Sequence, residues 1–167
     1  CGYIEEWSDP RLVRDAHLGS IWEGTSNIVA LDVMRAIVRE DSLPVWQSHV
    51  TEMLSQSPWH TRVRESLALL IEQGVALAAE TAEQKDEAMA RQAASVLYNL
   101  TTIIAMGWEA GQTGSKRRLL LAQLGLCHRL LPRNPLQAPP TTDLSALFET
   151  EACETPWQDL TVLNILD

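Results

Sequence analysis

The sequence has few cysteines, no excess of basic residues and no long apolar run, and each absence excludes a class of protein. Its 167 residues include three widely spaced cysteines, Cys1, Cys127 and Cys153, which form neither a metal-ligand pattern nor an even set of disulfides. Such cysteine usage favours a reducing, cytoplasmic environment. No segment approaches the apolar length that spans a bilayer, and none resembles a signal peptide, so we expect no membrane association.

The net charge of −9 argues against a general affinity of the whole chain for nucleic acid. The charge is unevenly spread, however. Between residues 100 and 133 the single acid is Glu109, and the basic residues are Lys116, Arg117, Arg118, Arg129 and Arg133. Residues 134–167 contain six acids and no Lys or Arg. We expect the acidic end to pack near the basic segment, and a basic patch that serves another partner is the alternative.

Strand patterns, solenoid repeats and glycine-rich phosphate loops are also missing. No segment shows a convincing apolar–polar alternation, and the segment Gly111–Gly114 is better interpreted as a turn than as a nucleotide-binding loop. Apolar residues instead recur at three- and four-residue spacing between short turns. The sequence therefore predicts an all-α fold, an antiparallel helix bundle, in one compact domain.

The apolar periodicity and the helix-start signals give the expected helices. Leu12, Val13 and Ala16 share a face of the first. Ser42 is expected to cap the third helix and Ser57 the fourth, each with a proline in the following turn. The expected ranges are about 10–18, 26–38, 43–56, 58–80, 82–109 and 115–131, then a proline-rich connection over 132–140 and a short helix near 142–151.

The segment Ile21–Asn27 lies between the first two expected helices and is the main candidate site. Gly24 breaks the chain there, and Thr25, Ser26 or Asn27 can accept hydrogen bonds from the free amides of the second helix. Glu23 is therefore a carboxylate held at a helix–helix corner. Such an acid complements the helix dipole, or it is a base presented into a cavity from a rigid turn.

Three correctly spaced pieces of the first forty residues carry a family resemblance. Gly2-Tyr3, Arg14-Asp15-Ala16-His17 and Ile21-Trp22-Glu23-Gly24-Thr25 together resemble the C-terminal signature of the flavin-dependent acyl-CoA dehydrogenases. The chain departs from the family pattern in two places. His17 replaces the more usual Arg or Lys, and the two further glycines expected before Gly2 are missing because the chain begins at Cys1. We accordingly expect this chain to be a fragment of a longer polypeptide.

The resemblance implies a reaction and a set of roles. Glu23 would remove the proton next to an acyl-CoA thioester while hydride passes to FAD, and Gly24 would lie against the substrate. Thr25, Ser26 and Asn27 would contact the diphosphate and adenine of FAD, often across a dimer interface. An electron-transfer flavoprotein or a similar acceptor, and a homo-oligomeric parent, are further expectations. The fragment alone would be inactive and would not hold FAD.

The stretch after Glu40 is longer than the tail that ordinary acyl-CoA dehydrogenases carry. Together with this longer stretch, three segments make the chain resemble the branch related to the bacterial adaptive-response alkylation protein: Ser20–Gly24, Asn27-Ile28 and Leu31–Arg35. That branch implies oligomer contacts, and proposed DNA binding, for the extra helices. We therefore divide the chain into the end of the family's C-terminal helical domain (1–41), a helical extension (42–131) and a proline-rich connection with a tail (132–167).

Other candidate sites are weaker. His49 and His60 have no partner at metal-ligand spacing, so no metal site is expected. Cys127 and His128 are adjacent, and adjacent side chains on a helix point in different directions, which makes a catalytic dyad improbable. The six tryptophans are interpreted as core and interface anchors.

Overall fold

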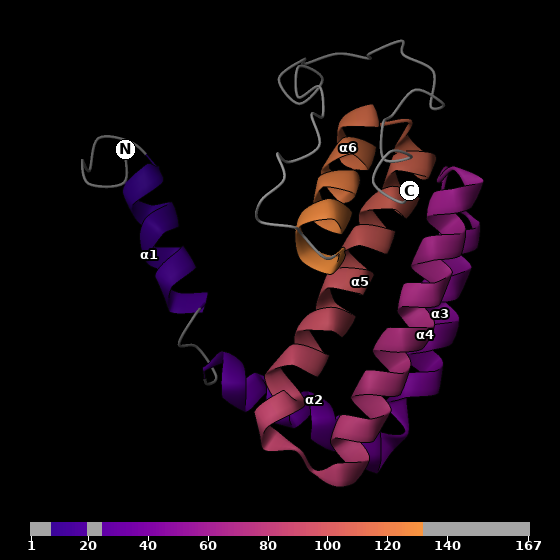
Figure 1. The fold of residues 1–167 in the computed structure, drawn as a ribbon. Helices are drawn as coiled ribbons and strands as arrows, with labels where there is room; N and C mark the ends of the chain where they lie inside the picture. The colour runs from indigo at the N-terminus through magenta and orange to yellow at the C-terminus, as the bar shows by residue number, and fades with distance from the viewer. Residues whose placement is uncertain (1–7, 20–24, 132–167) are drawn as a thin grey trace, which may run out of the picture.

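The computed structural model describes residues 8–19 and 25–131, and within these ranges the chain is helical without a strand. The predicted all-α fold is confirmed. Short turns join four helices into an antiparallel bundle, and α2 (Ser26–Glu40) lies across one end of it (Figure 1). The four helices are α3 (Ser42–Ser55), α4 (Thr61–Gln84), α5 (Glu87–Thr113) and α6 (Lys116–Gly125). The predicted segments at 132–140 and 142–151 lie outside the described residues.

The first helix, α1 (Asp9–Gly19), is drawn away from the bundle (Figure 1). Its predicted range is confirmed within a residue at each end. Leu12 and Val13, which we expected on its apolar face, are 60% and 42% exposed. Ala16 is also exposed, so the described helices do not bury this face.

Helix α5 is the centre of the bundle because it packs against α2, α3, α4 and α6. Leu97, Leu100 and Ile104 lie on its buried side. Removing a Leu or Ile side chain from water contributes about 1.5–3 kcal/mol. Val63, Leu67 and Ile71 of α4 are buried too.

The core has two parts. The larger part joins α3, α4, α5 and α6 through long aliphatic side chains, including the fully buried Leu67, Leu100, Ile104 and Leu119. The smaller part joins α2 to α4 and α5 and is rich in alanine, with Ala30, Ala78, Ala82, Ala90 and Ala93. A methyl side chain allows helices to approach closely, and these alanines let α2 pack against α4 and α5.

Two of the expected helix starts differ in the structure. Asp41 adopts the left-handed conformation (φ 48°, ψ 42°), and Ser42, predicted as a cap, is the first residue of α3. The predicted cap of the fourth helix at Ser57 is also wrong, because α4 begins at Thr61 after an N-cap at His60. The Nδ1 atom of His60 accepts a hydrogen bond from the Arg62 amide at 3.4 Å.

Tertiary contacts explain the late start of α4. Trp59 is 4% exposed, and its indole lies against Gly107 of α5. The Nη2 atom of Arg64 donates to the carbonyls of Ser57 (2.9 Å) and Trp59 (3.2 Å). These bonds satisfy backbone acceptors that a helix would otherwise use, and they hold the loop in a non-helical path.

The later boundaries shift as well. α4 continues to Gln84, four residues past the predicted end, and the turn lies at Lys85 and Asp86. The Oδ1 atom of Asp86 accepts from the amides of Ala88 (3.0 Å) and Met89 (3.2 Å) and so caps α5. The predicted helix over 115–131 divides into α6 and a wider π-helical turn, η1 (Leu126–Leu130).

Candidate functional site

The corner between α1 and α2 is the site that the sequence predicts. Glu23 and Gly24, the expected base and substrate contact, lie outside the described residues. The structure does show that one helix leads into this corner and another leads out of it. The Arg14–His17 segment lies on exposed positions of α1, where Arg11 also forms an exposed ion pair with Asp15 at 3.7 Å.

Thr25, Ser26 and Asn27 form the exposed start of α2. Thr25 occupies the N-cap position with extended backbone (φ −71°, ψ 163°), but its side chain makes no capping hydrogen bond. The first backbone bond of the turn runs from the Val29 amide to the Thr25 carbonyl at 3.1 Å. The amides that precede Val29 therefore have no partner within the helix, and the helix dipole adds positive potential there. Such a start favours an anionic group.

The minor candidates take structural roles or none. His60 caps α4, and His49 is exposed. Within 8–19 and 25–131, no group of three or more His, Cys, Asp or Glu side chains is placed to hold a metal ion. No helix in the same ranges combines the length and apolar character that a membrane span needs.

Cys127 and His128 point to different environments. Cys127 is buried in η1, whereas His128 is exposed. Burial raises the pKa of the Cys127 thiol above its ordinary value of 9.0, so the reactive thiolate is disfavoured at neutral pH. The two residues do not form a catalytic dyad.

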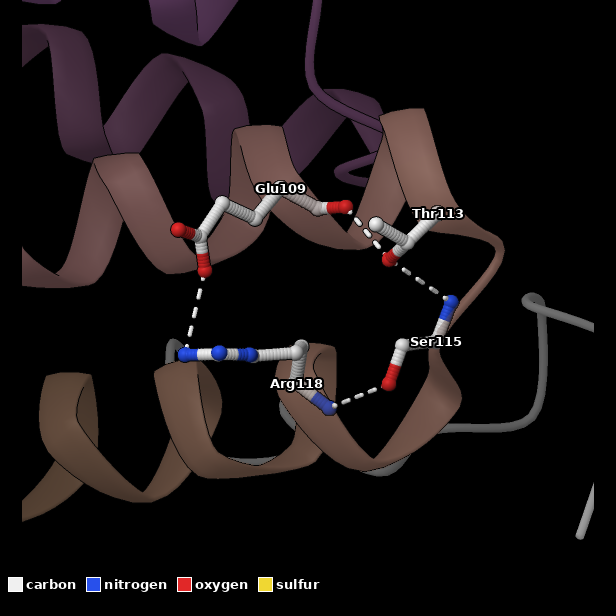
Figure 2. A network of polar contacts seen from close by, with 4 residues as sticks. All are labelled: Glu109, Thr113, Ser115 and Arg118. Atoms are coloured by element: carbon white, nitrogen blue, oxygen red, sulfur yellow. Dashed lines mark hydrogen bonds and ion pairs between the residues drawn. The ribbon is translucent and has the colours of Figure 1, made fainter.

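The basic start of α6 is joined to the end of α5 by a small polar network (Figure 2). The guanidinium of Arg118 lies 3.0 Å from the Glu109 carboxylate. The Thr113 hydroxyl donates to the Glu109 carbonyl at 2.7 Å, and the Ser115 hydroxyl accepts from the Arg118 amide at 3.3 Å. Lys116 and Arg117 form no ion pair with the described residues. The sequence did not predict this network, because the Glu109–Arg118 contact depends on how the turn folds back.

A groove of about 370 Å³ separates α2 from the α4–α5 turn, and the sequence did not predict it. Leu31, Met34 and Ala82 give it apolar lining, and charged side chains of both signs, including Lys85 and Glu87, also line it. Its walls come from segments far apart in the chain, which is why no local pattern indicates it. The mixture of charges selects no particular ligand.

About a third of the chain is similar in sequence to acyl-CoA dehydrogenases. It is 39% identical over 57 residues to acyl-CoA dehydrogenase family member 11 of Caenorhabditis elegans. It is 41% identical over 56 residues to the putative acyl-CoA dehydrogenase AidB of Escherichia coli strain K12. Each alignment covers 34% of this chain but 9% of the relative. No family model and no solved structure matches the chain. The similarity supports a relationship with the acyl-CoA dehydrogenase family.

Proposed function

We propose that this chain is the C-terminal part of an FAD-dependent acyl-CoA dehydrogenase, which introduces a double bond between the α and β carbons of an acyl-CoA thioester. The main support for the proposal is the signature Ile21–Thr25, which lies between the end of α1 at Gly19 and the start of α2 at Ser26. The identities of 39% and 41% with two acyl-CoA dehydrogenases support the same family.

In this proposal Glu23 is the base that removes the α-proton. A base must lie within hydrogen-bond reach of the C–H that it attacks, and an apolar surrounding raises the pKa of a carboxylate toward neutrality. Gly24 would lie against the substrate. A backbone amide at the corner donates to the thioester carbonyl and stabilises the charge that develops on its oxygen. FAD would supply the acceptor for the hydride that leaves the β carbon.

Thr25, Ser26 and Asn27 would hold the diphosphate and adenine of FAD. The exposed start of α2 fits that role, because its first amides lack helical partners and the Thr25 hydroxyl makes no capping bond. An anion at this position would gain hydrogen bonds from the backbone and a favourable interaction with the helix dipole.

The complete enzyme needs more than this chain. The aligned segment is 9% of the length of each relative, and the pocket that selects the acyl chain is expected elsewhere. We expect the 167-residue chain alone to be inactive and to bind no FAD, and a yellow, stoichiometric holo-fragment would contradict this. A homo-oligomeric, cytoplasmic parent that passes electrons to an electron-transfer flavoprotein completes the proposal.

The test uses the full-length parent with its flavin. Anaerobic mixing with a panel of acyl-CoA thioesters should bleach the flavin absorbance. Glu23→Gln should slow the bleaching strongly, whereas Glu40→Gln, at the exposed end of α2, should not alter it. If no thioester reduces the flavin of the wild-type protein, the proposed reaction is wrong.

A second candidate function is a flavoprotein of the same fold that acts in the alkylation stress response, with the extension as a DNA-binding or oligomerisation module. Lys116 and Arg117, which form no ion pair with the described residues, favour it. The net charge of −9 opposes it. Duplex DNA binding that weakens steeply with salt, in a protein whose flavin no thioester reduces, would favour this function over the first.

A further inference from the structure

One side of α6 is left uncovered by the described helices. Among them α6 packs mainly against α5 (Figure 1). Leu119, Leu120 and Ala122 are buried. On the other side Arg117, Leu121 and Leu124 recur at helical spacing, and so they share a face. Arg117 is exposed and Leu121 is 37% exposed. We call these three residues the outer α6 face, and Lys116, one residue before Arg117, adds positive charge beside it.

The outer α6 face combines positive charge with apolar surface. Residues 110–131 contain no acid, and Glu109 is already occupied by Arg118 at 3.0 Å. Lys116 and Arg117 lie in the first turn of α6, where the helix dipole adds positive potential instead of compensating it. An acidic segment with apolar side chains is the partner that this face fits.

The end of the same chain has that composition. Residues 134–167 contain six acids and no Lys or Arg. Within them Leu144, Leu147 and Phe148 recur at helical spacing, with Asp143 and Glu149 beside them. A helix over this segment, as the sequence predicts, would present one apolar stripe with carboxylates at its edges.

We propose that residues 143–151 dock on the outer α6 face of the same molecule, and this does not depend on the catalytic assignment. Leu144 follows Leu131 by thirteen residues, which reach up to about 40 Å when extended. The distance back along α6 from Leu131 to Arg117 is about 20 Å. The connection is therefore long enough, and tethering gives the segment an effective concentration of about a millimolar. Docked there, the segment shields the basic start of α6 from other acidic partners.

A paramagnetic label in the tail tests this docking in the full 167-residue chain. Cys153 carries a nitroxide in a Cys1→Ser background, and the buried Cys127 thiol reacts poorly. At low salt the amide signals of residues 117–124 should lose most of their intensity. The signals should recover at high salt, because the Debye length shortens to about 3 Å at 1 M and the attraction between the exposed charges is screened.

Two variants and one mixture decide the result. Lys116→Glu with Arg117→Glu should restore the α6 signals, whereas Arg39→Glu with Arg91→Glu, the same charge change at exposed positions elsewhere, should not. Circular dichroism confirms that each variant is folded. Undiminished α6 signals at low salt would overturn the proposal. A mixing experiment tests whether the partner is a second copy. One chain carries the nitroxide and no isotope label, and the other carries the isotope label and no nitroxide. Broadening of the α6 signals in this mixture would also overturn the proposal.

Discussion

The carboxylate of Glu109 in α5 lies 3.0 Å from the guanidinium of Arg118 in α6, across the turn that contains Gly114 (Figure 2). Gly114 ends α5 with φ 69°, a left-handed conformation that glycine adopts without a steric penalty. The contact joins the last two described α-helices. It also neutralises one of the three adjacent basic residues at the start of α6, which leaves Lys116 and Arg117 to give that surface its charge.

Glu109→Gln should lower the free energy of unfolding by less than about 1 kcal/mol, because both side chains are about half exposed. Urea unfolding of Glu109→Gln, Arg118→Gln and the double variant measures the coupling between the two residues. The coupling should decrease as salt is added. A salt-independent coupling of several kcal/mol would show that the pair is more important than its exposure indicates.

Gly107→Ala should destabilise the bundle by up to about 2 kcal/mol. A Cβ at Gly107 would lie 2.7 Å from Cε2 and 2.8 Å from Cζ2 of Trp59. Overpacking a core costs about 1–3 kcal/mol, which exceeds the gain of about 1 kcal/mol from replacing glycine within a helix. Thermal and urea unfolding measure the change.

The matched control for Gly107→Ala is the same change in a Trp59→Leu background. With the indole removed, the overlap is relieved and only the helix propensity remains, so Gly107→Ala should become stabilising there. If the substitution destabilises both backgrounds equally, the contact between Gly107 and Trp59 does not explain the glycine.

Asp86→Ala should cost about 1 kcal/mol, because it removes the side-chain cap of the Ala88 and Met89 amides. Thr25→Ala should have almost no effect on stability, because the Thr25 side chain makes no capping bond. In the full-length parent, however, Thr25→Ala should weaken FAD binding. Unfolding curves and flavin titration separate the two roles, and a large stability loss in Thr25→Ala would contradict this assignment.

The Cys127 thiol should react slowly with iodoacetamide at pH 8 in the folded chain and rapidly after unfolding, because burial disfavours its thiolate. The raised pKa also fixes the direction of a pH effect. Above pH 9 the unfolded thiol loses its proton while the folded one retains it, so stability falls as pH rises. Cys127→Ala should lack this contribution, and mass spectrometry of the alkylated peptide follows the reaction.

The helical fold was predictable because apolar spacing is a local property of the sequence. Val63, Leu67 and Ile71 recur at helical intervals and are buried together. The start of α4 was not predictable from local signals, since Ser57 and Pro58 form a good helix-start pattern. Burial of Trp59 against Gly107, which is distant in the chain, and two hydrogen bonds from Arg64 override that pattern.

The candidate site is known from the sequence more than from the structure. The spacing of the motif around Glu23 and the helices on both sides of the corner were predicted, and the helices are confirmed. The roles of Glu23, Gly24, Thr25, Ser26 and Asn27 remain predictions. The groove beside Met34 and the Glu109–Arg118 contact required the three-dimensional fold, because each joins elements that no local pattern relates.

The central claim is that Glu23 removes the α-proton of an acyl-CoA. The most direct measurement is the single-turnover rate of flavin reduction in the full-length parent, with acyl-CoA that carries hydrogen or deuterium at the α carbon. We predict that the wild-type rate falls on α-deuteration, and that Glu23→Gln, with FAD still bound, is slower by about 10²–10⁴-fold. A Glu23→Gln protein that reduces its flavin at the wild-type rate, with the same isotope effect, would contradict the claim.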